Sequence, residues 1–285
     1  MGRDTETMRH ILLDDMEIEY EERGAGEPLV LIHAGVFGDW FLPVYQSAAL
    51  DGFRIIRVHR PGYGPQVPER HLTLGEHARA VAGLADHLDL GPFHWVGHSS
   101  SCLMGLELAV ARPDLVHSLA LLEPAAGGGF AVQASADLGQ RFIGPAMGAF
   151  MAGDLEGAFD TFLRGVCGDD YRAVIEASLG PEGYQRAVRD SAFFFRDEII
   201  AVQESQFAAT DAARVGQPIL VVEGGESASL GPLSHQITER ATALLPHAEV
   251  AIIDGVNHAM PLQDPGAVGR AIAAFVRRHP IASPA

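Results

Sequence analysis

The sequence predicts an α/β protein with a mostly parallel sheet, and two patterns carry that prediction. Six short runs are almost continuously apolar, as strands buried on both faces of a parallel sheet are; they span 28–33, 53–59, 93–98, 118–123, 218–224 and 249–254. Longer stretches with helical periodicity lie between them, at 72–88, 101–113, 233–246 and 267–279. Strands that alternate with helices indicate βαβ units.

Two regions depart from this alternation. Residues 9–23 contain two weaker runs, which we interpret as an antiparallel pair ahead of the parallel strands. From 125 to 215 there is no convincing strand, and this region holds nine of the 14 phenylalanines. We therefore expect an α/β core formed by 1–124 and 216–285, with a helical cap at 125–215 inserted over the sheet.

Composition excludes several classes of function. A formal net charge of −17 disfavours binding to nucleic acid or to anionic membrane surfaces, both of which require basic patches. No run is long enough to cross a membrane, and the polar first ten residues lack the apolar segment of a secretory signal. The two cysteines form no disulfide framework and suit a reducing compartment, so we expect a cytoplasmic protein.

The segment VGHSSSCLMG, residues 96–105, contains a candidate nucleophile. It resembles the pattern G-x-S-x-G, which marks a sharp strand-to-helix turn that exposes a serine, although Ser101 stands where the second glycine belongs. A strand precedes Ser99 and a helix follows it, which is the context the motif requires. The alternative is a serine-rich helix N-cap. We favour Ser99 as a nucleophile, with the backbone N–H of Ser100 facing a developing oxyanion.

A serine nucleophile needs a base, and His258 has the best position among the 13 histidines. It follows the last predicted strand in a Gly/Asn turn and comes last in chain order, as the base does in the order Ser, acid, His. A loop histidine that caps the next helix is the alternative interpretation.

Four motifs together resemble the α/β-hydrolase superfamily: HAG at 33–35, HRPGYG at 59–64, GHSSS at 97–101 and GVNHAMPLQDP at 255–265. The resemblance extends from about residue 8 to residue 279. It implies an eight-stranded sheet, a helical cap and a hydrolytic or related reaction at the serine. By its position in this family's pattern, Gly35 would supply the second oxyanion N–H.

The acid is where this sequence departs from the family. Most members carry an Asp shortly after the strand that follows the cap, but Ser227 occupies that position here. Glu226 could replace it, or the protein could work as a dyad or be inactive. We prefer Glu123, which ends the strand after the nucleophile strand and so lies at the same sheet edge as Ser99. Zearalenone-type lactonases, which resemble this chain, place a Glu there.

These observations favour a serine hydrolase that cleaves an ester or lactone of a mainly apolar or aromatic small molecule, with no cofactor and no metal. Carbon–carbon bond hydrolysis or perhydrolysis by the same triad remains open, as does a non-catalytic ligand-binding protein on this scaffold. A serine at the elbow argues against the haloalkane dehalogenases and epoxide hydrolases of this fold, which use an Asp. A homodimer is compatible with the sequence. The side chains expected to line the pocket are Val36, Phe37, Phe130, Phe150, Met151, Phe194 and Met260.

Overall fold

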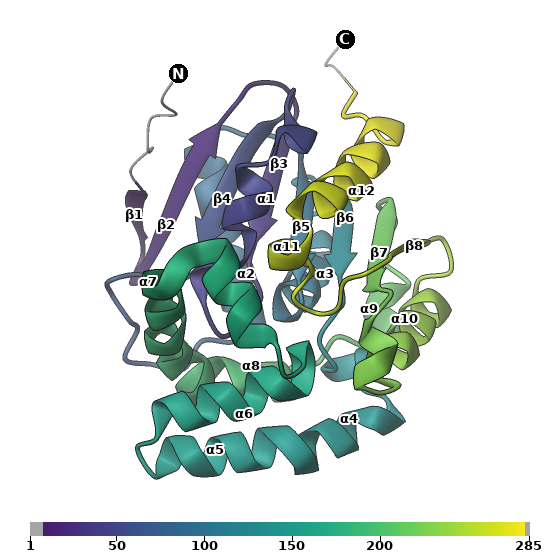
Figure 1. Ribbon diagram of the computed structural model, residues 1–285. Helices are drawn as coiled ribbons and strands as arrows, with labels where there is room; N and C mark the ends of the chain where they lie inside the picture. Colours follow the sequence, from purple (N-terminus) through teal and green to yellow (C-terminus); the bar gives the residue numbers. More distant parts are fainter. Residues whose placement is uncertain (1–7, 283–285) are drawn as a thin grey trace.

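The sheet predicted from the sequence is present. A computed structural model describes residues 8–282, in which eight strands form one sheet in the order β1-β2-β4-β3-β5-β6-β7-β8 (Figure 1). The pairs β1–β2 and β2–β4 are antiparallel, and the pairs from β4 through β8 are parallel. The predicted α/β class and the mostly parallel eight-stranded sheet are therefore confirmed. Residues 1–7, which belong to the segment that lacks a secretory signal pattern, lie outside the described residues.

The parallel strands begin and end within two residues of the predicted runs. The strands are β1 Arg9–Leu13, β2 Met16–Arg23, β3 Pro28–Ile32, β4 Arg54–His59, β5 Phe93–His98, β6 Val116–Leu122, β7 Ile219–Gly224 and β8 Glu249–Ile253. The helices around the sheet are α1 Leu42–Tyr45, α2 Leu74–His87, α3 Ser100–Ala111, α10 Leu233–Leu244, α11 Met260–Gln263 and α12 Pro265–Arg278.

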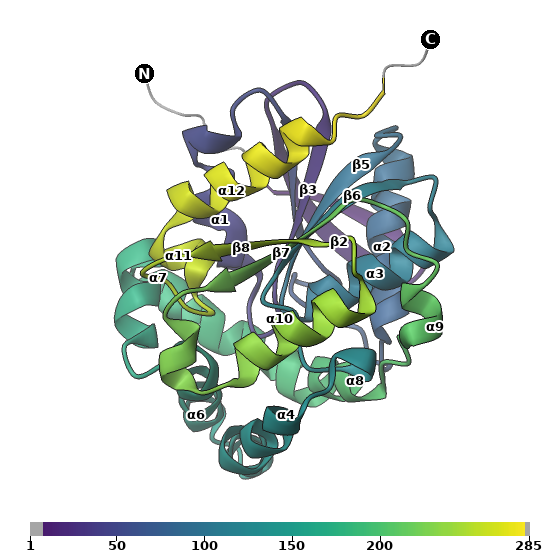
Figure 2. The same cartoon turned by 90° about the vertical axis from the view of Figure 1, so that its right-hand side faces the viewer.

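Helices cover both faces of the sheet, as Figure 2 shows from the side. Successive side chains of a strand point to opposite faces of the sheet and so belong to two separate apolar cores. On β3, Val30 and Ile32 belong to the core beneath α2 and α3, whereas Leu29 and Leu31 belong to the core beneath α1 and α12. This double burial explains why the parallel strands are apolar at nearly every position.

A layer of helices lies between β6 and β7 in the sequence and below the carboxyl ends of the strands (Figures 1 and 2). We call α4–α9, with the segments that join them, the inserted helices; they are α4 Gln133–Leu138, α5 Gly144–Met151, α6 Leu155–Cys167, α7 Tyr171–Phe193, α8 Ile199–Glu204 and α9 Ala209–Ala212. Two π-helical segments interrupt them, Gly139–Ile143 and Phe194–Glu198. Several of their aromatic residues, among them Phe159, Phe194 and Phe195, pack with Phe37 and Trp40, which follow β3, into a third apolar cluster.

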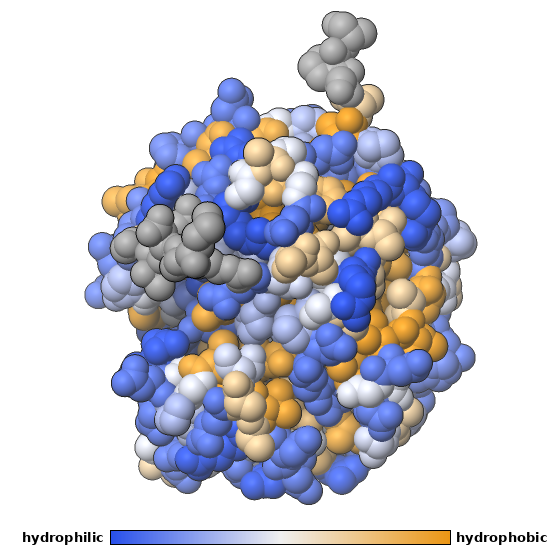
Figure 3. Space-filling view, turned by 45° about the horizontal axis from the view of Figure 1, so that its top comes forward, coloured by the Kyte–Doolittle hydropathy of each residue, from blue (hydrophilic) through white to orange (hydrophobic). Residues whose placement is uncertain are grey.

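One face of the molecule is largely hydrophilic. Figure 3 shows this face, on which apolar residues lie between the hydrophilic ones and gather mainly at the right-hand side of the view. Over residues 8–282, none of the helices is long and apolar enough to cross a membrane.

Candidate active site

Ser99 occupies a sharp turn between β5 and α3. Its backbone has φ 57° and ψ −116°, outside the ordinary regions for a residue with a side chain, as a strained strand-to-helix turn requires. Close packing leaves no room beside Gly97, where a Cβ would lie 2.7 Å from Trp95 Nε1. Strain held in this way is typical of functional positions.

Ser101 stands where the family pattern has a second glycine, and its hydroxyl forms hydrogen bonds across the turn. It accepts the His98 N–H at 2.7 Å and donates to the Ile32 carbonyl oxygen at 2.7 Å. The hydroxyl therefore ties the turn after β5 to the end of β3. A small side chain that hydrogen-bonds across the turn replaces the close packing that a glycine would allow.

Glu123 and His258 form a hydrogen-bonded pair. Glu123 directly follows β6, and its Oε2 lies 2.8 Å from His258 Nδ1. Burial works to raise the pKa of Glu123, but hydrogen bonds from His258 and Ser227 and the charge of His258 outweigh it, so this pKa lies below its ordinary value. An ionised carboxylate only accepts hydrogen bonds, so Nδ1 carries the hydrogen and Nε2 is left as the proton acceptor.

Three further donors hold the Glu123 carboxylate. Oε1 accepts the backbone N–H of Gly224 at 2.9 Å and the Ser227 hydroxyl at 2.5 Å. Oε2 accepts the Ser234 hydroxyl at 3.2 Å in addition to His258. Ser227, which stands where the family pattern has its acid, therefore supports the carboxylate of Glu123 just after β6. The sequence did not reveal this role of Ser227, because a Ser at this position indicated only that the expected Asp is absent.

The alternative acid Glu226 lies elsewhere. Its side chain is exposed at the surface, and its backbone N–H donates to the Val256 carbonyl at 2.8 Å. The pair with His258 is made by Glu123.

One cavity collects the candidate residues. Ser99, Ser100, Glu123 and His258 line it together with Gly35, and it encloses about 1300 Å³ of empty space, counting the part open to solvent. Apolar side chains from the inserted helices form much of the remaining wall, including Phe142, Phe162, Phe194 and Ile199. Both π-helical segments contribute residues to this wall, in keeping with the frequent use of such segments at functional sites.

The predicted pocket needs correction at five positions. Val36 and Phe194 line the cavity, whereas the other five side chains lie outside its wall: four pack against other residues, and Met151 is exposed to solvent. Phe37 stacks on Trp40, Phe130 packs against Phe207, Phe150 packs against Phe195, Met260 belongs to the core beneath α12, and Met151 is 83% exposed.

Both candidate oxyanion donors, Ser100 and Gly35, line this cavity. Ser100 begins α3, so its N–H lies in the first turn, where helical N–H groups have no partner within the helix. Gly35 follows β3 and has no space for a side chain, since a Cβ would lie 2.7 Å from the ring of Phe194. Within residues 8–282, no three His, Cys, Asp or Glu side chains gather as a metal site would require.

Comparison with known proteins agrees with this fold. A family model described as the alpha/beta hydrolase family matches residues 29–271. The dihydrolipoyllysine-residue acetyltransferase component of the acetoin cleaving system of Pseudomonas putida is 30% identical over 264 residues, covering 89% of this chain but only 64% of that relative. The 2-hydroxy-6-oxo-6-phenylhexa-2,4-dienoate hydrolase of Comamonas testosteroni is 32% identical over 120 residues, covering 39% of this chain and 41% of that enzyme.

Among solved structures, the enol-lactonase of Burkholderia xenovorans LB400 superimposes with a TM-score of 0.77 at 19% identity, covering 94% of this chain and 100% of the other. At that identity the likeness concerns the fold.

Proposed function

The chain belongs to the alpha/beta hydrolase family, and from that premise we propose that it is a serine hydrolase that cleaves an ester or lactone of a mainly apolar small molecule. Ser99 is the nucleophile, His258 the base and Glu123 the acid. The hydrogen bond of 2.8 Å between Glu123 and His258, beside the cavity that Ser99 lines, carries this proposal.

The proposed reaction has two stages, formation of an acyl-enzyme and its hydrolysis. Ser99 Oγ attacks the substrate carbonyl carbon while its proton passes to His258 Nε2. The carbonyl oxygen becomes an oxyanion, which the N–H groups of Gly35 and Ser100 stabilise. When the tetrahedral intermediate collapses, the bond to the leaving oxygen breaks, and that oxygen takes the proton from His258. Water then attacks the acyl-enzyme with the same base and releases the acid.

Glu123 contributes orientation and charge. Its carboxylate fixes the tautomer in which His258 Nε2 can accept a proton, and it stabilises the imidazolium that forms in the transition state. Because Ser227, Ser234 and Gly224 also donate to this carboxylate, it stays ionised and in place although it is only 4% exposed.

The inserted helices act as a cap in this proposal, with residues 125–215 covering a core formed by 1–124 and 216–285. The cap supplies most of the apolar wall, so the substrate's acyl or alcohol part is mainly apolar or aromatic. The similarity in fold to an enol-lactonase supports including lactones.

A carbon–carbon bond hydrolase is the second candidate. The local similarity to the Comamonas testosteroni hydrolase favours it, since the aligned stretch belongs to an enzyme of that class. Product analysis with a vinylogous diketone and with an ester separates the two reactions.

A turnover screen tests the proposal. Purified protein is assayed on aryl esters and lactones of varied acyl length, beside Ser99→Ala and the control Ser229→Ala, which changes an exposed serine outside the cavity. We expect wild type and the control to cleave at least one ester or lactone and Ser99→Ala to lose that activity. Cleavage at the same rate by Ser99→Ala contradicts the mechanism. Tight binding of these compounds without turnover favours a binding protein.

A further inference from the structure

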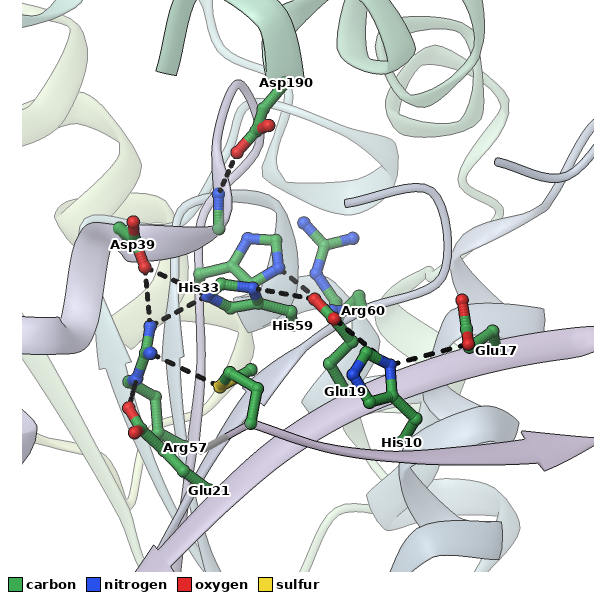
Figure 4. A network of polar contacts seen from close by, with 12 residues as sticks. His10, Glu17, Glu19, Glu21, His33, Asp39, Arg57, His59, Arg60 and Asp190 are labelled. Carbon is green, nitrogen blue, oxygen red and sulfur yellow. Dashed lines mark hydrogen bonds and ion pairs between the residues drawn. The ribbon is translucent and has the colours of Figure 1, made fainter. Parts of the chain in front are cut away.

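The peptide between Ala34 and Gly35 is held from its carbonyl side. Ala34 O accepts the Nδ1–H of His33 at 2.6 Å and an Nη2 hydrogen of Arg60 at 3.2 Å. The backbone N–H of Arg60 in turn donates to His33 Nε2 at 3.1 Å, which sets the His33 tautomer, and Figure 4 shows these two residues side by side. In a trans peptide the N–H points away from the carbonyl, so these bonds direct the Gly35 N–H.

A buried carboxylate of the inserted helices, that of Glu198, links Arg60 to Ser100, the second candidate oxyanion donor. Glu198 ends the second π-helical segment and is completely buried, and its Oε1 accepts the Ser100 hydroxyl at 2.5 Å. Arg60 Nη2 lies 2.9 Å from Oε1 and 3.1 Å from Oε2 of the same carboxylate, and Tyr63 OH also donates to it. A Cβ on Gly35 would lie 3.3 Å from Glu198 Oε1.

We propose that the Arg60–Glu198 ion pair positions both halves of the oxyanion hole, with Glu198 as a positioning residue that links the cap to the hole. Arg60 holds the Ala34–Gly35 peptide, and Glu198 holds the Ser100 side chain at the start of α3. The proposal rests on the serine mechanism proposed above.

Charge explains why both partners are needed. A lone carboxylate this close to the hole would oppose the negative charge that develops on the substrate oxygen, and because Glu198 is completely buried, water would screen this repulsion little. Arg60, which is also completely buried, neutralises it. Breaking a buried ion pair leaves an uncompensated charge, so each partner depends on the other.

A neighbouring residue provides the matched control. Asp197 lies next to Glu198 on the same π-helical segment, is 5% exposed and also ties the cap to the core. Its oxygens, however, accept the Leu72 N–H at 3.1 Å and pair with His71 Nδ1 at 3.0 Å, away from the hole. Asp197→Asn and Glu198→Gln therefore make the same chemical change at two buried cap carboxylates, of which only Glu198 contacts the Ser100 side chain.

The experiment measures kcat and KM for an ester that the wild type cleaves, and the affinity for a trifluoromethyl ketone, whose hemiketal oxyanion occupies the hole. For Glu198→Gln we expect kcat and the ketone affinity to fall by a similar factor, about 100-fold, with little change in KM. Asp197→Asn should keep both near wild type. Ser100→Ala keeps its N–H but loses the hydroxyl that reaches Glu198, and we expect a loss of about tenfold in kcat.

The outcomes separate the two proposals. If Glu198→Gln and Asp197→Asn change kcat equally, or if KM rises while the ketone affinity is retained, the positioning role is wrong and the serine mechanism stands. If Glu198→Gln does not fold, Ser100→Ala decides, and unchanged kcat in that variant overturns the inference. A wild type that hydrolyses no ester or lactone overturns the proposed function and this inference with it.

Discussion

Replacing Glu123 by Gln should disable the base without disturbing the fold. The substitution keeps the size of the side chain but turns one oxygen into an NH₂ group, so its orientation matters. The carboxylate's Oε1 faces the Gly224 N–H, a donor that cannot rotate, at 2.9 Å. We therefore expect the amide oxygen of Gln to take this position and its NH₂ to face His258.

That orientation reverses the tautomer of the base. An NH₂ group opposite His258 Nδ1 needs an acceptor there, so the ring proton moves to Nε2, which then cannot take the proton of Ser99. Loss of tautomer control and of the negative charge costs about 10³- to 10⁴-fold in kcat, roughly 4–5.5 kcal/mol of transition-state stabilisation.

The assay is steady-state ester hydrolysis at pH 7, with the thermal unfolding midpoint measured in parallel to show that the variant is folded. Glu226→Gln, an exposed change, is the matched control and should keep wild-type kcat. A kcat of Glu123→Gln within tenfold of wild type would show that Glu123 is not the catalytic acid, and a large loss of kcat in Glu226→Gln instead would assign the acid to Glu226.

Two further predictions concern the surroundings of the site, and a third concerns the carboxyl group of Asp190. Ser227→Ala removes one of the donors to Glu123, so we expect kcat to fall about tenfold. Ser227→Asp should reduce kcat further, because it places a second carboxylate against that of Glu123. Equal kcat in both variants would contradict this repulsion. Gly35→Ala would press a methyl group onto the Phe194 ring, 2.7 Å away, so kcat should fall strongly, and the additional change Phe194→Leu should recover part of it in the same assay. Burial raises the pKa of Asp190 to about 6, where it accepts the Gly38 N–H (Figure 4). The folded protein therefore holds this proton to a higher pH than the unfolded chain, and the group's contribution to stability is lost as pH rises through this range. In urea denaturation, the free energy of unfolding of Asp190→Asn should exceed that of wild type by about 1–3 kcal/mol at pH 7 and equal it near pH 3.5. Equal stability of the two proteins at both pH values would contradict a raised pKa of Asp190.

Local patterns made the fold predictable. Apolar runs gave the parallel strands to within two residues because burial on both faces leaves little choice of side chain. The turn at Ser99 was also visible locally, since a strand, a glycine and a helix follow one another within a few residues. Glu123 required one further step, namely that the carboxyl ends of neighbouring parallel strands meet at one edge.

The pocket was much less predictable, because the direction of a helical side chain depends on packing that periodicity does not reveal. Phe194 lines the cavity, yet the adjacent Phe195 is completely buried against Phe150. Glu198 follows three phenylalanines and two charged residues, and its partner Arg60 lies 138 positions away. Nothing near it in the sequence distinguishes it from a solvated helix end, so its place beside Ser100 emerged only from the structure.

Labelling with a fluorophosphonate measures whether His258, oriented by Glu123, activates Ser99. This probe reacts with an activated serine and releases fluoride, so intact-protein mass spectrometry followed by peptide mapping locates the adduct. We predict one adduct, on Ser99, that forms quickly in wild type and in Glu226→Gln and much more slowly in His258→Ala and Glu123→Gln. An unlabelled wild type, an adduct on another serine, or equal labelling rates in all four proteins would show that the Glu123–His258 pair does not activate Ser99.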